Sequence, residues 1–260
     1  MPFANLRTVR LHYDLAGPDD APVVVFSNSL GANLSMWDAQ FPEFSRRYRV
    51  LRYDTRGHGE SSLPPGPHTL ASVADDVLAL LDYLAISVAS FCGLSLGGMT
   101  GMWLARHSPE RIHRLIACSA AAKIGTKESW DARIDLVRRE GMQAVAPGIL
   151  DRWFTPAFHT SAPGAVASVR RTVEEAPVDG YSAGCAVVRD ADLGECLSGI
   201  HIPTLIANGT SDPVTPPTDG QFLAAHIPGA RYSEFAGAHL FTVESAPEFT
   251  AQALGFLGAP

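Results

Sequence analysis

The segment GLSLG at residues 93–97 decides the fold, because it places one serine between two glycines. The preceding run, VASFC at 88–92, is short, apolar and partly β-branched, which predicts a buried strand. The following run, from Gly98 through Leu104, is apolar enough for a core helix that ends before Pro109. A sharp turn from strand to helix needs small residues two positions on either side of the serine. The pattern therefore predicts that Ser95 occupies a nucleophile elbow at the head of a helix.

A glycine-rich loop that happens to contain a serine is the alternative, because G-x-S-x-G also recurs by chance.

The length and composition of the chain are compatible with an enzyme. Its 260 residues could form one large α/β domain or two small ones, and 46% hydrophobic with 18% charged residues is ordinary for a soluble enzyme. A net charge of −7 without a long basic run argues against nucleic acid as a partner.

The cysteines and the apolar runs indicate the cellular setting. The four cysteines form no C-x-x-C pair and no metal-ligand spacing with histidine, which favours buried free thiols. No export segment and no apolar run of about 20 residues is present, so we expect neither secretion nor a membrane partner. We expect a cytoplasmic protein.

Strand and helix patterns alternate through residue 120, after an antiparallel strand pair within 3–16. Further strands are expected at 22–26, 48–54, 88–92, 112–118, 202–207 and 231–235. A helix with apolar residues at helical spacing lies between Val73 and Leu84, and a last helix begins after Pro247. This order predicts an α/β protein with a mainly parallel sheet that helices cover on both faces.

Residues 121–198 interrupt that pattern, because no convincing strand occurs there. Ser129 to Glu140 fits an amphipathic helix, and further helical pieces are expected to break at prolines 147, 156, 163 and 177. Because the ends of this block return to consecutive strands, we interpret it as an insertion. The expected domains are an α/β core, residues 1–120 and 199–260, and a helical cap, residues 121–198.

A serine hydroxyl becomes a nucleophile only when a base takes its proton and an acid orients that base. Asp212 follows the strand at 202–207, and His239 follows the strand at 231–235. With Ser95, both then lie at carboxyl ends of strands, where open α/β sheets form their sites. Asp212 could instead only cap a Ser-Asp-Pro turn. His58, between two glycines, is the rival base, and we interpret its segment as a structural turn.

A developing oxyanion needs two backbone N–H donors. Leu96, directly after the serine, is one candidate. Leu30, in the loop after the strand at 22–26, is the other, although its small polar neighbours could form a plain turn.

Several short sequence motifs indicate which family this chain resembles. They are SNSLG at 27–31, MWD at 36–38 with Gln40, RYDTRGHG at 52–59, AAKI at 121–124, RWFTP at 152–156, GY at 180–181 and CAVVRDAD at 185–192. Together they resemble the 3-oxoadipate enol-lactonases of the α/β-hydrolase fold, over essentially the whole chain. The strings in the helical block are the most specific, whereas the segment at 54–59 is common to many hydrolases. One departure is Phe241, where a small polar residue would be more usual.

The resemblance implies a serine hydrolase that opens the enol-lactone of 3-oxoadipate in the β-ketoadipate pathway of aromatic degradation, without a metal or organic cofactor. The substrate is an anionic small molecule, so a protein of net negative charge would need a local cation, usually arginine. The candidate substrate-binding residues are Arg133, Trp130, Arg152 and Trp153; Lys123 and Arg189 are weaker candidates. The alternative to substrate binding is that the arginines are solvated and the tryptophans belong to the cap core.

Other functions stay open at this stage. The same fold serves general carboxylesterases, carbon–carbon bond hydrolases of ring-cleavage products and cofactor-free perhydrolases, and Ser95, Asp212 and His239 do not separate these. A non-catalytic small-molecule receptor could also retain all three side chains.

Overall fold

A central sheet of eight strands organises the computed structural model, which describes residues 1–258. The sheet order is β1-β2-β4-β3-β5-β6-β7-β8. Its strands are β1 Phe3–Asn5, β2 Arg10–Ala16, β3 Val23–Ser27, β4 Arg49–Tyr53, β5 Ala89–Leu94, β6 Ile112–Cys118, β7 Thr204–Gly209 and β8 Arg231–Phe235. β1 and β2 pair antiparallel with their neighbours, and all later pairings are parallel. The expected α/β class and its mainly parallel sheet are confirmed.

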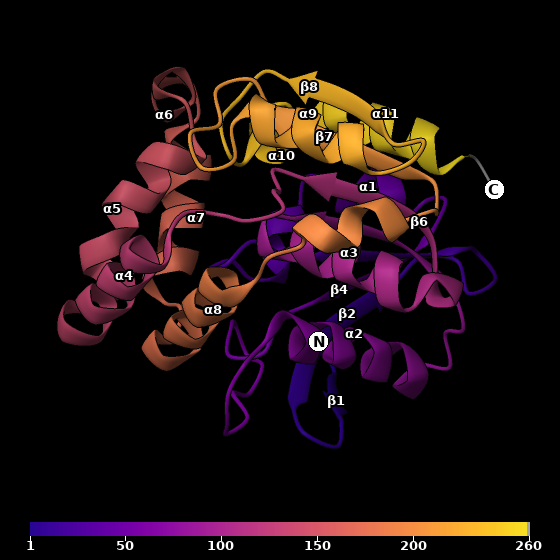
Figure 1. Cartoon of the computed structure of the whole chain (residues 1–260), viewed down its shortest axis with the longest axis horizontal. Helices are drawn as coiled ribbons and strands as arrows, with labels where there is room; N and C mark the ends of the chain where they lie inside the picture. The colour runs from indigo at the N-terminus through magenta and orange to yellow at the C-terminus, as the bar shows by residue number, and fades with distance from the viewer. Residues whose placement is uncertain (259–260) are drawn as a thin grey trace.

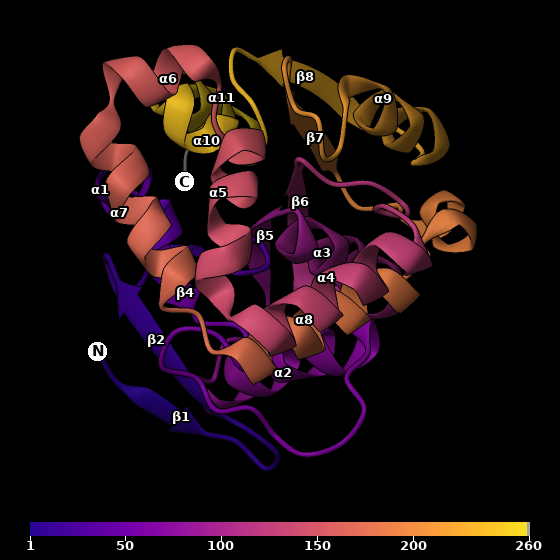
Figure 2. The same cartoon turned by 90° about the vertical axis from the view of Figure 1, so that its left-hand side faces the viewer.

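Helices cover both faces of the sheet. They are α1 Phe41–Phe44, α2 Leu70–Tyr83, α3 Leu96–His107, α9 Pro217–His226, α10 Phe241–Glu244 and α11 Ala246–Leu257, with 3-10 turns η1 Leu34–Trp37, η2 Pro109–Arg111 and η3 Gly194–Gly199. Helices α1 and α11 lie on one side of the strands, and α2, α3 and α9 lie on the other (Figure 2). Strands β3 and β5, buried on both faces, are accordingly almost wholly apolar.

Five consecutive helices separate β6 from β7 and gather at one end of the sheet (Figure 1). They are α4 Lys127–Glu140, α5 Met142–Trp153, α6 Pro156–Ser161, α7 Pro163–Glu174 and α8 Val178–Asp190. No strand interrupts them, as the sequence predicts for this block. We call α4–α8 the cap; its division from the core as a separate domain stays a prediction. Within residues 1–258, no helix is both long and apolar enough to cross a membrane.

The prolines of the cap act differently from one another. Pro156 and Pro163 open α6 and α7, where the missing N–H has no intrahelical role. The prediction that Pro147 breaks a helix is wrong, because this residue lies inside α5. An interior proline costs about 3 kcal/mol. Burial of neighbouring α5 side chains such as Ile149 and Trp153 offsets that cost.

Capping explains where the first cap helix begins. Helix α4 starts at Lys127 rather than at the expected Ser129. The side chain of Thr126 accepts a hydrogen bond from the Ser129 amide, and the Ser129 hydroxyl accepts one from the Thr126 amide. This reciprocal capping box satisfies two N–H groups that the first turn leaves free, so Ser129 belongs inside the helix.

Candidate active site

Ser95 lies at the strained turn between β5 and α3. Its backbone has φ 58° and ψ −113°, a conformation that non-glycine residues rarely adopt. The flanking glycines make this turn possible. A Cβ atom on Gly93 would collide with the carbonyl of Gly97, and one on Gly97 would collide with the carbonyl of Ser27. The expected elbow geometry is therefore present, and the strain holds the Ser95 side chain at the carboxyl end of the sheet.

Asp212 and His239 meet on the neighbouring loops. The Nδ1–H of His239 donates to Oδ2 of Asp212 over 2.8 Å, and both residues are buried, at 1% and 3% exposure. The loop after β7 thus supplies the carboxylate of this pair, and the loop after β8 supplies the imidazole. Because Nδ1 is engaged by the carboxylate, Nε2 is the ring nitrogen left to act as a base.

The Asp212 carboxylate is held in its ionised form. It accepts hydrogen bonds from the Val214 and Thr215 amides, from the Thr215 hydroxyl and from His239. Burial by itself would raise the pKa of Asp212, but the charge of His239 and these hydrogen bonds outweigh it and lower that pKa. Asp212 does cap its turn, because Oδ1 accepts from the Val214 and Thr215 amides. Its Oδ2 also accepts from His239, so the carboxylate does more than cap the turn.

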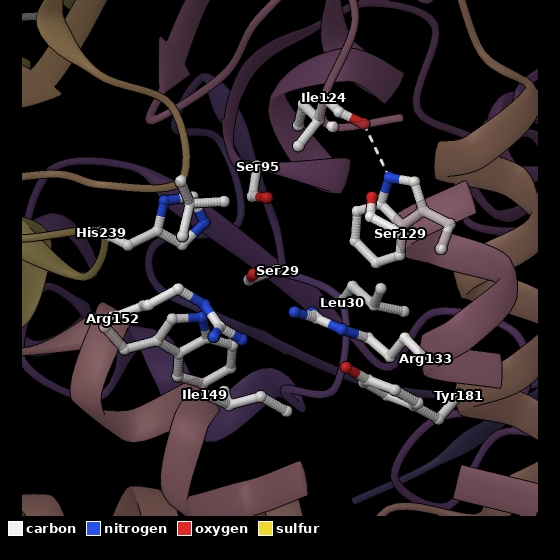
Figure 3. A pocket seen from close by; sticks show the side chains of 14 residues that line it. Ser29, Leu30, Ser95, Ile124, Ser129, Arg133, Ile149, Arg152, Tyr181 and His239 are labelled. Carbon is white, nitrogen blue, oxygen red and sulfur yellow. Dashed lines mark hydrogen bonds between the residues drawn. The ribbon is translucent and has the colours of Figure 1, made fainter. Parts of the chain in front are cut away.

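Ser95 and His239 open onto one cavity (Figure 3). The hydrogen bonds within residues 1–258 include none between the Ser95 hydroxyl and His239. Catalytic hydrogen bonds are often long before substrate binds, so this geometry is compatible with a serine–histidine pair. The rival base His58 does not line the cavity; it is buried, and its Nδ1 hydrogen bonds to the Arg56 carbonyl. Burial lowers the pKa of His58, which favours a neutral structural imidazole.

Two backbone amides lie beside Ser95. Leu96 is the first residue of α3, so its N–H has no partner within the helix. Leu30 lines the cavity from the turn after β3. The adjacent Gly97 amide donates to the Asn28 carbonyl over 3.1 Å, which fixes the turn after β3 against the elbow. Leu30 and Leu96 stay the predicted donors to an oxyanion.

The cavity has a volume of about 160 Å³ and lies between the sheet and the cap. All four of the predicted substrate-binding residues, Trp130, Arg133, Arg152 and Trp153, line it. Seven further residues that the sequence did not predict for the site line the cavity: Ser29, Ile124, Gly125, Ser129, Ile149, Tyr181 and Val214. In the sequence, Tyr181 belongs to one of the family motifs, and an aromatic residue on a cap helix is a recognisable candidate for lining a substrate cavity.

Two guanidinium groups share this cavity. Arg133 from α4 and Arg152 from α5 both reach into it (Figure 3), and Arg133 lies 5.0 Å over the Trp130 ring. The ion pairs of residues 1–258 include neither group. Burial and the nearby charge of Arg133 lower the pKa of Arg152. A half-buried arginine pair without a carboxylate is suited to binding an anion.

The weaker candidates lie elsewhere. Lys123 pairs with Asp192 over 3.5 Å, and Arg189 pairs with Asp131 and Asp190, so both cations are already compensated outside the cavity. Phe241, the departure from the family pattern, stacks on Phe235 in the core and does not line the cavity.

The side chains that line the cavity are compatible with acyl transfer to a serine hydroxyl. Among residues 1–258, no group of three or more His, Cys, Asp or Glu side chains could hold a metal ion. The cavity does contain a hydroxyl, an imidazole and two cations, which are the groups needed to attack and hold an anionic ester.

Known proteins match this fold and sequence. Residues 22–246 match the family described as alpha/beta hydrolase fold. 3-Oxoadipate enol-lactonase 2 of Acinetobacter baylyi is 44% identical over 94% of this chain and 91% of that protein, and enol-lactonase 1 of the same organism is 37% identical over 97% and 95%. The crystal structure of the enol-lactonase from Burkholderia xenovorans superimposes with a TM-score of 0.97 at 43% identity, covering 98% and 99% of the two chains. The chain therefore belongs to the α/β-hydrolase fold family, in which 3-oxoadipate enol-lactonases are its relatives by both sequence and structure.

Proposed function

We propose that this protein is a serine hydrolase that opens 3-oxoadipate enol-lactone with water to give 3-oxoadipate. The observation that carries the proposal is one cavity lined by Ser95, by the Asp212-bound His239 and by two uncompensated arginines. Ser95, His239 and Asp212 would hydrolyse the ester bond, and the two arginines would favour an ester that carries a negative charge. The names of the enol-lactonases that this chain resembles support the same substrate.

In the proposed acylation step, Nε2 of His239 takes the Ser95 proton while Oγ attacks the lactone carbonyl carbon. The Leu30 and Leu96 amides hold the resulting oxyanion. The intermediate collapses by breaking the bond between the carbonyl carbon and the ring oxygen, and the histidinium returns the proton to the leaving oxygen. That oxygen leaves as an enol, which tautomerises to the ketone and makes reversal unfavourable.

In the proposed deacylation step, a water molecule replaces the serine. His239 takes a proton from the water as its oxygen attacks the acyl carbon, and the same two amides hold the second oxyanion. Collapse expels the Ser95 oxygen, which recovers its proton from the histidinium. Asp212 stays ionised and stabilises the imidazolium in both steps. One water molecule is consumed, and the enzyme returns to its starting state.

We propose that Arg133 and Arg152 bind the acetate arm of the lactone and that Trp130 and Trp153 wall its ring. Charge-assisted hydrogen bonds from guanidinium to carboxylate contribute about 1.5–3 kcal/mol each. The arginines lie on cap helices, whereas Ser95 and His239 lie on the sheet. The cap therefore would orient the carbonyl over the elbow by holding the far end of the substrate.

The cellular setting is part of the proposal. Cys92, Cys118 and Cys185 are buried free thiols, and Cys196 is a half-buried one. Free thiols are typical of a reducing compartment, which supports a cytoplasmic location. The role in aromatic degradation follows from the proposed substrate.

Assays with three substrates test the proposal. We expect a much higher kcat/KM with the enol-lactone than with nitrophenyl acetate or a ring-cleavage dienoate. A general esterase would instead prefer the simple ester, and a carbon–carbon bond hydrolase would prefer the dienoate. Either result would overturn the substrate assignment.

Replacement of Ser95 by alanine tests the nucleophile. We expect kcat to fall by at least about 10³-fold, because no activated hydroxyl is then present to attack the lactone carbonyl. Binding of 3-oxoadipate, measured by calorimetry, and the melting temperature should change little. A variant that keeps its turnover would exclude Ser95 as the nucleophile, and a wild-type protein that binds the ligand without turnover would indicate a receptor.

A further inference from the structure

The cap is hydrogen bonded directly to the loop that carries His239. The His239 amide donates to the Arg152 carbonyl over 3.4 Å, and the Leu240 amide donates to the Trp153 carbonyl over 2.9 Å. In Figure 3 the Arg152 and His239 side chains lie at the same wall of the cavity. The end of α5 and the loop after β8 thus behave as one paired segment, although they are far apart in the sequence.

Glu244, at the end of α10, joins the same two segments through its side chain. Its Oε1 accepts from the Ala238 amide over 2.7 Å and from the Thr155 amide over 3.2 Å. Its Oε2 accepts from the Thr155 hydroxyl over 2.6 Å. Ala238 directly precedes His239, and Thr155 follows the Arg152-Trp153 pair within the α5–α6 corner. One carboxylate therefore holds both sides of the junction.

The remaining support of the His239 backbone comes from the sheet. The His239 carbonyl accepts from the Ser119 hydroxyl over 2.9 Å, at the end of β6. Its amide has only the long bond to the cap. The imidazole is therefore held on the core side by Asp212 and Ser119, and the backbone that carries it is held on the cap side by the bonds of Glu244 and of the Leu240 amide.

We propose that Glu244 is a positioning residue that couples the substrate-binding corner of the cap to the base. Its hydrogen bonds fix the loop that aims His239 at Ser95, and the same bonds fix the segment that places Arg152 and Trp153. Occupation of the cap by the substrate and orientation of the base are then linked through one side chain. This inference rests on the proposed function for the identity of the substrate and for the roles of Ser95 and His239.

The chemistry of the side chain explains why a glutamate fits here. An ionised carboxylate is acceptor-only, so it can receive hydrogen bonds from three donors at once. Glutamine has nearly the same shape but replaces one oxygen with a donor. Glu244→Gln removes the charge and one acceptor without the loss of volume that an alanine would cause. An NH2 that faces Ala238 leaves that amide without its acceptor, and an NH2 that faces Thr155 can only donate to the hydroxyl, which reverses that bond.

The test compares E244Q with wild type and with E248Q, a matched control at an exposed glutamate of α11. We expect kcat of E244Q to fall about 10- to 100-fold with both the enol-lactone and nitrophenyl acetate, because a small misplacement of the base slows chemistry on any ester. KM should rise for the lactone, which uses the cap arginine, and much less for nitrophenyl acetate. E248Q should match wild type in every measurement.

Thr155 supplies a second, conservative pair of variants. T155V removes the hydroxyl that donates to Glu244 and should change kcat and KM in the same directions as E244Q, to a smaller extent. T155S keeps the hydroxyl and should restore wild-type values. Thr155 also caps α6 through a bond from the Phe158 amide, so circular dichroism and melting temperature are recorded for each variant.

The outcomes separate the possible roles. A lower melting temperature with unchanged kcat well below it would make Glu244 merely structural and overturn the proposal. A higher KM for the lactone alone, with unchanged kcat on nitrophenyl acetate, would confine Glu244 to the cap and also overturn it. The labelling rate of Ser95 by a small fluorophosphonate reports on the base without any substrate. An unchanged labelling rate in E244Q would refute the proposal even if the lactone were not the substrate, so failure of the two proposals can be told apart.

Discussion

Each candidate catalytic side chain depends on a few neighbours that fix its conformation. Asp212 accepts from two amides, one hydroxyl and one imidazole, so its carboxylate has no free direction in which to turn. His239 is oriented by Asp212 on one ring nitrogen. Arg133 and Arg152, in contrast, form no ion pair with a carboxylate within residues 1–258 and keep their hydrogen-bonding capacity for a ligand. The site thus combines candidate catalytic groups that their hydrogen bonds hold in place, Asp212 and His239, with candidate binding groups that form no ion pair, Arg133 and Arg152.

Replacement of Arg133 by alanine tests the binding role. We expect KM for the anionic enol-lactone to rise roughly 10- to 100-fold, because a charge-assisted hydrogen bond contributes about 1.5–3 kcal/mol. KM for the neutral nitrophenyl acetate should change much less. Steady-state kinetics on both esters, with Arg189→Ala as a control outside the cavity, measures the difference. Equal changes for both esters would exclude Arg133 from carboxylate binding.

The lowered pKa of Asp212 predicts a pH dependence of stability. An aspartate in the unfolded chain has a pKa of about 3.9. Because the folded-state pKa of Asp212 lies below its ordinary value, the ionised carboxylate stabilises the fold above pH of about 4. That contribution is lost as the pH falls through the folded-state pKa. Urea unfolding between pH 5 and pH 2 should therefore show wild type losing stability faster than Asp212→Asn; parallel curves would contradict the prediction.

At the scale of elements, the β5–α3 junction is the most constrained part of the chain. Helix α3 can begin directly after Ser95 only because two glycines let β5, α3 and the turn after β3 approach within contact of their backbones. We therefore expect the elbow to tolerate little change at its two glycines. In the cap, Thr126 caps the start of α4, Thr155 and Pro156 mark the start of α6, and Pro163 opens α7.

Substitution of Gly97 by alanine tests that constraint. The added Cβ would meet the Ser27 backbone, so the junction must shift or open. We expect a loss of more than about 3 kcal/mol in the free energy of unfolding, or no folded protein. Gly255→Ala is the matched control, because its Cβ would enter open space inside α11, and it should stabilise by about 0.5–1 kcal/mol. Chemical denaturation of both variants gives the comparison, and equal stabilities would contradict the role of the close approach.

At the scale of the molecule, the cap and the core enclose two neighbouring cavities. The first, of about 160 Å³, contains Ser95. The second, of about 240 Å³, is mostly apolar and lies among η1, α7 and α10, with Met36, Val169 and Val243 in its walls. Trp153 lines both cavities. This side chain is therefore a wall that the two cavities share, and we expect it to limit the length of the acyl group next to Ser95.

Replacement of Trp153 by alanine should join the two cavities. We expect the ratio of kcat/KM for nitrophenyl hexanoate to that for nitrophenyl acetate to rise about tenfold, at a stability cost of about 3–5 kcal/mol. Adding Val169→Phe on the same background refills the second cavity and should reverse the gain. An unchanged ratio in Trp153→Ala would show that the two cavities do not communicate.

Local patterns in the chain were enough to predict the fold. Apolar runs, glycine spacing and the order of strands and helices gave the parallel sheet, the elbow at Ser95 and the helical block, because these features depend on near neighbours in sequence. Pro147 is the exception, since packing of α5 overrode a local helix breaker. The roles of Ser95, Asp212, His239 and the cap residues stay predictions, although all but the buried Asp212 line or adjoin one cavity.

The contacts that complete the site could not be inferred in this way. Three features join segments that are distant in the chain. Arg133, Arg152 and Tyr181 line one cavity, the Glu244 carboxylate accepts a hydrogen bond from the Thr155 hydroxyl, and Trp153 lines both cavities. Such contacts depend on which helix faces meet, and periodicity along a single element carries no information about its partner. Residue type thus specified the chemistry that is available, and packing of the cap on the sheet selected which of these groups face one another.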